Sequence, residues 1–172
     1  MLSLSDNEFS VIGFLVRNFS ERLTIRSIAQ KLGFSAAGVF NILKKLEKDS
    51  VVTGEKLGTG LFYSINYNNR IAFHLASISL LYSEDKMDKS VIESSQKFKN
   101  ALFDKKSLLI VDEGITVDAQ FSGVNIIMKT EEELLALMRK KDPVILEIFK
   151  KGICLNGEKK FVELIRDSTF RY

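Results

Sequence analysis

The sequence predicts an α+β protein in which helices and a β-hairpin come first and a mixed region of strands and helices follows. In residues 6–48, apolar side chains recur at helical spacing behind three hydroxyl caps, and two β-rich runs around a glycine-bearing turn follow over residues 51–65. From residue 107 onward, short apolar runs alternate with helix-start signals. The chain of 172 residues is 45% hydrophobic and 27% charged, which is typical of a globular protein and leaves room for two small domains.

Capping signals divide the N-terminal region into three helices. Ser5 with Glu8 three residues later forms a capping-box pattern for the first helix. Thr24 is the expected cap of the second helix and Ser35 that of the third. Between them stands Gly33, where a tight turn needs a left-handed residue. The third helix is expected to bury Val39, Leu43 and Leu46 and to expose Ala36, Ala37, Phe40, Asn41, Lys44 and Lys45.

This order of helix, tight turn, helix and hairpin over residues 24–67 resembles the winged-helix family of prokaryotic transcription regulators. The resemblance implies that the helix of residues 35–48 enters the major groove of double-stranded DNA, with the hairpin beside it. The residues that match the DNA-facing positions are Arg26, Ser35, Ala36, Ala37, Phe40, Asn41, Lys44, Lys45, Lys56 and Thr59.

Individual side chains on this face suggest separate roles. Asn41 can present a bidentate amide to adenine, while Lys44 and Lys45 are expected to meet phosphate. For Phe40 two interpretations stand side by side: contact with thymine methyl groups, or half-burial against the hairpin. Residues 1–70 hold nine basic and six acidic residues, whereas the remainder holds sixteen of each, so the positive balance lies in the N-terminal part.

Residues 70–83 predict a helix that is apolar on most sides. Such a helix needs cover on several sides, and a second subunit or the second domain would supply it. We expect a homodimer, because two-fold dimers that read two half-sites are the common solution among such regulators. The side chains assigned to this contact are Ile71, Leu75, Ile78 and Tyr82.

The C-terminal region is expected to form a small α/β domain. Its predicted elements are a helix from residue 83 to about residue 102, strands at 107–111, 115–121 and 124–128, helices at 130–139, 142–151 and 158–166, and a short apolar segment at 153–155. The expected domains are therefore residues 1–69, a linking helix over 70–85, and residues 86–172.

The second half also carries a family resemblance. The strand at 124–128, the helix start Thr130-Glu131-Glu132, the stretch Lys141-Asp142-Pro143 and the segment Gly152-Ile153-Cys154-Leu155-Asn156-Gly157-Glu158 follow one another. This order resembles the C-terminal end of minimal nucleotidyltransferase domains, some of which are joined to winged helices. In that family a Gly-Ser loop holds the nucleotide phosphates and paired aspartates hold Mg²⁺.

The residues for that chemistry do not stand where the family has them. The chain contains no Gly-Ser pair, and it reads Lys105-Lys106-Ser107-Leu108 where paired aspartates are expected. Asp112, Glu113 and Asp118 remain nearby, and solvated strand ends explain them. We therefore expect a truncated, inactive domain with no catalytic residue, no metal and no cofactor.

Together these patterns predict a DNA-binding transcription regulator whose C-terminal domain serves assembly, partner binding or sensing. An antitoxin-like protein that binds a partner through its C-terminal domain stays open as an alternative. A DNA-tethered nucleotidyltransferase is disfavoured because its motifs are missing. No run is apolar and long enough for a membrane span, so a cytoplasmic location is expected. The target sequence, the effector, the partner and the direction of regulation are not written in the chain.

Overall fold

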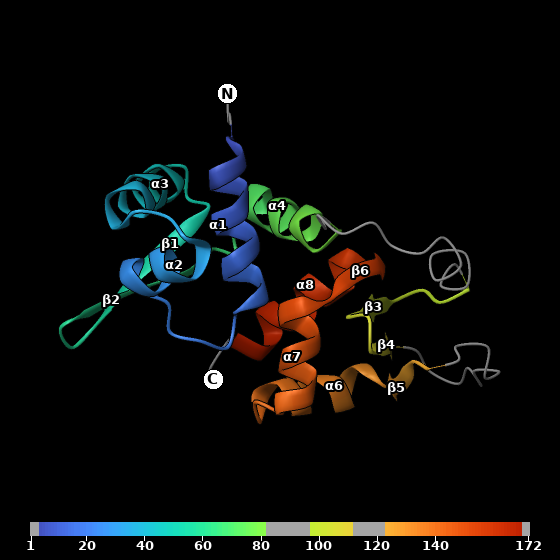
Figure 1. Cartoon of the computed structure of the whole chain (residues 1–172). Coiled ribbons are helices and arrows are strands. Elements are labelled where there is room, and N and C mark those ends of the chain that lie inside the picture. Colours follow the sequence, from blue (N-terminus) through green and yellow to red (C-terminus); the bar gives the residue numbers. More distant parts are fainter. Residues whose placement is uncertain (1–3, 82–96, 112–122, 170–172) are drawn as a thin grey trace. The chain divides into compact units, whose positions relative to one another are not determined.

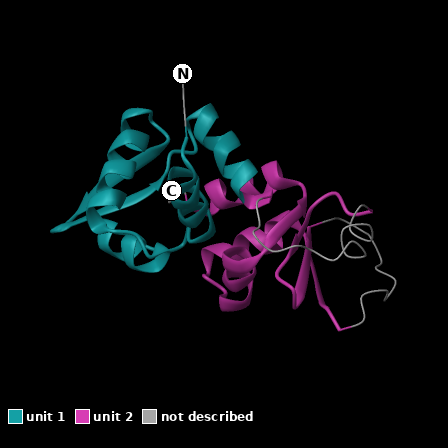
Figure 2. Ribbon diagram, turned by 45° about the horizontal axis from the view of Figure 1, so that its top comes forward, with its two compact units in different colours: residues 1–79 teal, residues 80–172 magenta. Residues whose placement is uncertain are grey.

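The computed structural model describes residues 4–81, 97–111 and 123–169, and the protein is an α+β protein (Figure 1). It divides into two compact units, Met1–Ser79 and Leu80–Tyr172, each of which is described by itself (Figure 2). None of the helices within the described ranges is long and apolar enough to cross a membrane. The elements of the first unit are α1 (Asp6–Arg17), α2 (Ile25–Leu32), α3 (Ala36–Lys48), β1 (Val52–Leu57), β2 (Gly60–Ile65) and α4 (Arg70–Leu81), whose last two residues fall in the second unit.

Local hydrogen bonds start the first three helices at the expected residues. Ser5 and Glu8 form the capping box of α1, and Thr24 forms another with Ser27 at α2. Gly33 closes α2 in the left-handed conformation with φ of 68°, and Ser35 caps α3. The tight turn between α2 and α3 is therefore confirmed, together with its physical cause.

The hairpin is antiparallel, with Val52 opposite Ile65 and Leu57 opposite Gly60. It projects from the helices in Figure 1. Its second strand has an additional partner, since Leu23 forms an isolated bridge with Tyr63, whose N–H donates to the Leu23 carbonyl at 2.8 Å. This bridge ties the hairpin to the segment just before α2.

Helix α4 contacts α1 at Ser79. Ala72, Ala76 and Ser79 are buried, and a Cβ at Gly13 of α1 would lie 3.7 Å from that of Ser79. Arg17 donates to the Ser79 carbonyl at 2.7 Å. Leu80 is also fully buried, whereas Ile71, Ile78 and Leu81 are exposed.

The second unit is built on a mixed four-stranded sheet of order β5-β4-β3-β6. Its elements are β3 (Ala101–Phe103), β4 (Ser107–Val111), β5 (Asn125–Lys129), α6 (Glu131–Arg139), α7 (Pro143–Lys151), β6 (Ile153–Asn156) and α8 (Glu158–Thr169). Strands β4 and β5 run parallel, with Leu108 opposite Ile126, and β3 is antiparallel to both β4 and β6.

Both faces of this sheet are apolar. One face gathers the buried residues Ala101, Phe103, Leu108 and Ile110 with Phe98, and the partly buried Val124, Ile126, Met128 and Leu155 pack against them. On the other face, Leu102 contacts the turn between α7 and β6, where a Cβ at Gly152 would lie 3.0 Å from its Cγ. A sheet that is apolar on both sides is typical of strands buried within a layered fold.

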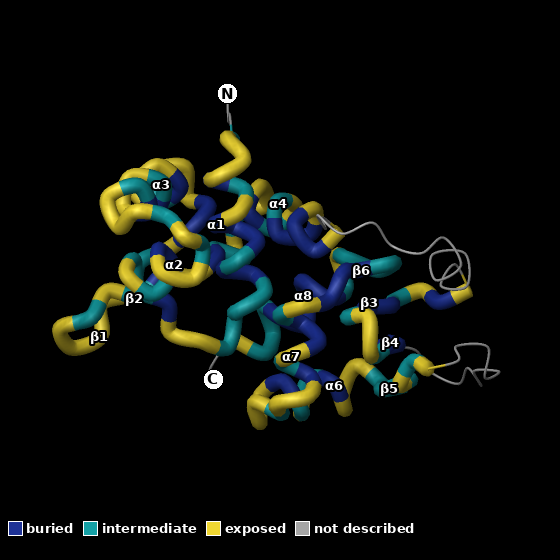
Figure 3. Tube along the Cα trace, viewed as in Figure 1, coloured by how far each residue is buried: buried dark blue, intermediate teal, exposed yellow. Residues whose placement is uncertain are grey.

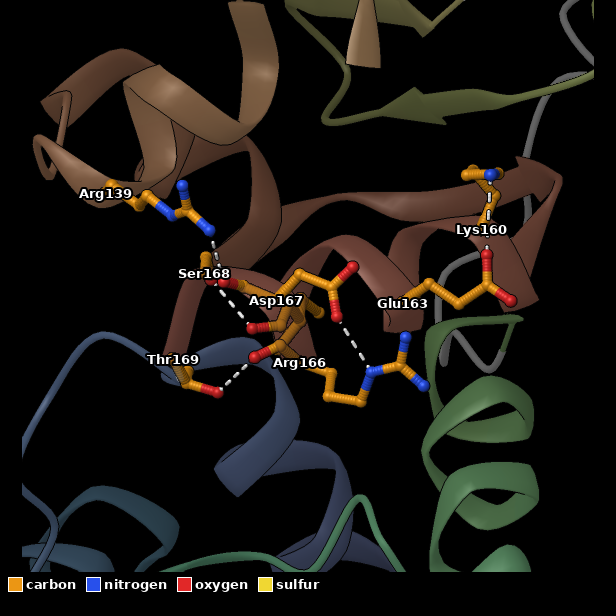
Figure 4. A network of polar contacts seen from close by, with 8 residues as sticks. Arg139, Lys160, Glu163, Arg166, Asp167, Ser168 and Thr169 are labelled. Carbon is orange, nitrogen blue, oxygen red and sulfur yellow. Dashed lines mark hydrogen bonds and ion pairs between the residues drawn. The ribbon is translucent and has the colours of Figure 1, made fainter. Parts of the chain in front are cut away.

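The helices of the second unit start at the expected residues. Thr130 and Glu133 form a capping box at α6, and Asp142 caps α7 with Pro143 at its first position. Figure 4 shows how the end of α8 is held: Arg139 of α6 donates to the Asp167 carbonyl at 3.1 Å, and Arg166 donates to the Asp167 carboxylate at 2.8 Å.

One expectation needs correction, and one segment that had no assigned conformation is a strand. The helix predicted to reach about residue 102 is wrong at its end, because Ala101–Phe103 form strand β3 between β4 and β6. The apolar segment at 153–155 is strand β6. Runs of three or four apolar residues are too short to show a period, so pairing with neighbouring strands decides their conformation. The strand predicted at 115–121 lies outside the described residues.

Candidate nucleic-acid interface

The exposed face of α3 is the centre of the candidate interface. Val39, Leu43 and Leu46 are fully buried beneath it, so the helix is fixed in rotation by its core side. Six side chains expected on the outer face are all exposed: Ala36, Ala37, Phe40, Asn41, Lys44 and Lys45. Figure 3 shows this exposure along α3 and again over the tip of the hairpin.

The first turn of α3 is unusually bare. The hydroxyl of Ser35 accepts a hydrogen bond from the Gly38 N–H at 3.0 Å, and no acidic residue stands in the first turn. Ala36 and Ala37 are exposed and small. The partial positive charge of the helix N-terminus is thus neither neutralised by a carboxylate nor covered by a long side chain.

Phe40 is 44% exposed, and the Lys44 ammonium lies 6.0 Å from the centre of its ring. This cation–π contact places an apolar surface and a positive charge next to each other on the exposed side of α3. Asn41 is exposed beside them.

Each of the two lysines expected to meet phosphate has a carboxylate partner. Lys44 pairs with Glu47 one turn along α3, with 3.0 Å between Nζ and Oε2, and this pair is exposed. Hydrogen bonding to Glu47 raises the pKa of Lys44 above its ordinary value. Lys45 pairs with Glu8 of α1, with 2.7 Å between Nζ and Oε1, and only 7% of the Glu8 side chain is exposed.

The environment of Glu8 favours its ionised form. Burial raises the pKa of this carboxyl, but the hydrogen bond from Lys45 and the backbone hydrogen bond from Ser5 outweigh burial, so the pKa lies below its ordinary value. The Ser5 N–H donates to the second carboxylate oxygen at 2.7 Å. Both oxygens of Glu8 are therefore engaged.

The hairpin lies against α3 and carries further exposed groups. A Cβ at Gly54 would lie 3.0 Å from the Glu47 carboxylate, which places β1 against the last turns of α3. Lys56 and Thr59, both expected at the interface, are exposed.

Sequence reasoning did not single out three exposed groups near the hairpin. Leu57 and Leu61 are 37% and 39% exposed at its tip. Arg22 lies with its guanidinium 5.9 Å from the centre of the Phe62 ring, and it is exposed. Only the charge of Arg22 signals a role in the sequence, because its position beside β2 depends on the bridge at Leu23.

The remaining expected site residues are distributed as follows. Arg26 is exposed on α2, and Ser35 is exposed at the start of α3. On α4, Ile71 and Ile78 are 51% and 52% exposed, and Leu75 is partly buried. Tyr82 lies outside the described residues. Leu81, which the sequence analysis did not assign to this surface, is 45% exposed.

The described part of the chain holds no group of three or more His, Cys, Asp or Glu side chains that are placed to bind a metal ion. Asp112, Glu113 and Asp118 fall outside the described ranges. Leu108 and Leu109, in the stretch where the resemblance leads one to expect paired aspartates, are buried in β4. A comparison of the chain with protein-family models and with curated proteins finds no match.

Proposed function

We propose that the protein is a DNA-binding transcription regulator of the winged-helix type. The observation that carries this proposal is the outer face of α3, which leaves a bare N-terminal turn, an exposed amide and an exposed lysine beside a projecting hairpin. A major groove admits one α-helix, and phosphates on either side of the groove are met by flanking groups. The positive charge balance of residues 1–70 favours the same surface.

In this proposal α3 enters the major groove with its N-terminal turn foremost. Asn41 reads adenine through its amide, Phe40 contacts thymine methyl groups, and Lys44 exchanges its Glu47 partner for phosphate. The DNA backbone is contacted by Lys56 and Thr59 on the hairpin and by Arg26 on α2, and these contacts position the protein.

Titration of the purified chain with a random-sequence duplex at several salt concentrations tests the proposal. The affinity is expected to fall with salt, and Lys56→Ala is expected to flatten the logarithmic slope by about 0.9 for one lost phosphate contact. Lys140→Ala, which removes the same charge from the exposed C-cap position of α6, is the matched control. Absence of duplex binding at low salt would disprove the function, and equal effects of the two variants would remove the hairpin from the interface.

We further propose that α4 pairs with α4 of a second copy. Helix α4 buries Ala72, Ala76 and Leu80, and it leaves the large apolar side chains of Ile71, Ile78 and Leu81 exposed, although such side chains are more often buried. These three positions recur at helical spacing and share one face. A symmetric dimer would cover them and present two copies of α3 to two half-sites.

Sedimentation of the wild type and of Ile78→Glu tests the dimer. The wild type is expected to sediment as a dimer at micromolar concentration and the variant as a monomer, because a carboxylate at the centre of the contact is desolvated without a partner. Asn68→Glu, exposed just before α4, introduces the same charge as a control. A monomeric wild type would contradict this proposal and leave DNA binding by a single copy to be measured separately.

For the second unit we propose a role in assembly, partner binding or sensing rather than nucleotide transfer. Its support is the apolar strand β4 at the position where the resembling enzymes carry metal-binding aspartates. Apolar side chains cannot coordinate Mg²⁺. Incubation with Mg²⁺, each labelled nucleoside triphosphate and protein or RNA acceptors is expected to give no label transfer. Transfer that disappears in Asp118→Ala would overturn this assignment.

A further inference from the structure

Adjacent lysines of α3 are held in different ways. Lys44 and Glu47 lie on the same helix, and their side chains are 53% and 35% exposed. Lys45 reaches across to α1, where the side chain of its partner Glu8 is almost completely buried. The two neighbouring lysines therefore pair with carboxylates that differ strongly in solvent exposure.

The two pairs differ in what it costs to open them. An exposed pair within one helix contributes little, because water solvates both ions when they separate. Opening the second pair would leave a nearly buried carboxylate without its cation, and this is strongly unfavourable. Glu8 is also fixed in place by the Ser5 N–H on its other oxygen, so it cannot follow Lys45 outward.

We propose that Glu8 withholds Lys45 from DNA phosphate and thereby limits the affinity of the protein for DNA. Of the two lysines, Lys44 contacts the DNA backbone and Lys45 does not. Lys45 is then a positioning residue that fixes α3 on α1 by its ion pair with Glu8. The inference rests on the proposed DNA binding, and it assigns a purpose to a carboxylate that stands at the edge of a surface otherwise suited to anions.

Salt-dependent duplex binding of Glu8→Gln provides the test. The amide keeps the size of the side chain and an oxygen for the Ser5 N–H, but it no longer holds Lys45 by charge. We expect tighter binding and a logarithmic salt slope that is steeper by about 0.9, as one more lysine reaches phosphate. Adding Lys45→Met to Glu8→Gln is expected to abolish this gain, and Lys44→Ala in the wild type is expected to flatten the slope by about 0.9.

Glu132→Gln on α6 changes the net charge equally at an exposed position and is the matched control. An equal gain in this variant would show a general charge effect and overturn the inference, as would an unchanged slope in Glu8→Gln. Thermal unfolding of each variant shows whether the fold is kept. If Glu8→Gln does not fold, Lys45→Met in the wild type decides, because a slope flattened as much as in Lys44→Ala would contradict the inference. Absence of duplex binding by the wild type at low salt would contradict the proposed function itself. Duplex binding with an unchanged slope in Glu8→Gln would contradict only the role of Glu8.

Discussion

Helices α3 and α6 begin with the same cap chemistry and then differ at every position of the first turn. Ser35 is followed by Ala36, Ala37 and Gly38, whereas Thr130 is followed by Glu131, Glu132 and Glu133. At α6 the third residue completes a capping box, and three carboxylates face the positive end of the helix dipole. At α3 a glycine occupies the capping-box position and no carboxylate is present.

On the proposed function, this difference separates residues that stabilise a helix from residues that leave it open to DNA. Acids in the first turn stabilise a helix by about 0.3–1 kcal/mol each, and glycine within a helix costs about 1 kcal/mol relative to alanine. Helix α3 gives up both contributions at the N-terminus that points to solvent. In the proposed function, small and uncharged residues leave this N-terminus open to phosphate, whereas α6 carries three acids at its start.

The largest expected effect comes from making α3 resemble α6. Ala37→Glu places a carboxylate at the second position of α3, where it favours the helix but repels DNA. We expect duplex affinity to fall on the order of a hundredfold, while the free energy of unfolding is unchanged or slightly higher. Binding titrations and thermal unfolding measure the two quantities, and Ala37→Gln is the uncharged control. Wild-type affinity in Ala37→Glu would show that the bare first turn of α3 has no role in DNA binding.

A smaller effect is expected from base reading further along α3. Asn41→Ala should cost about 1–3 kcal/mol on a preferred site selected from random duplexes, and much less on random DNA. The ratio of the two affinities is the relevant measurement, with Ser64→Ala on the exposed side of β2 as a control. Equal losses on both duplexes would assign Asn41 to general contact and leave the groove-facing role of α3 to its other residues.

The smallest effect is expected from removing the cap of α6. Thr130→Ala removes the cap hydroxyl that accepts a hydrogen bond from the Glu133 N–H, and we expect a loss of about 1 kcal/mol in unfolding free energy. Duplex binding by the folded variant should be unaffected. Chemical denaturation followed by a binding titration separates the two quantities. If DNA affinity changed in Thr130→Ala, the role of α6 would extend beyond stability.

Much of the fold could be predicted because its signals are local. The caps at Ser5, Thr24 and Thr130 and the left-handed turn at Gly33 depend on residues at most three or four positions apart. The spacing of Val39, Leu43 and Leu46 predicts the buried face of α3, and the exposed side chains of this helix follow from it.

Other features depend on parts of the chain that are distant in sequence. Strand β3 has three residues and no readable period, and only its place between β4 and β6 makes it a strand. Leu81 is exposed on α4 while the adjacent Leu80 is fully buried, and a helix that is apolar on most sides does not reveal which of its apolar side chains face outward.

The sequence by itself determined where the helices start, which side of α3 is buried, and where the positive charge balance lies, because each of these follows from neighbouring side chains or from composition. The tertiary structure decided what those charges do. Glu8 and Lys45 appear in the sequence as a cap residue and an exposed lysine, and only the packing of α1 against α3 brings them to 2.7 Å. Burial then makes this ion pair costly to open, whereas the neighbouring pair of Lys44 and Glu47 stays in water and opens readily.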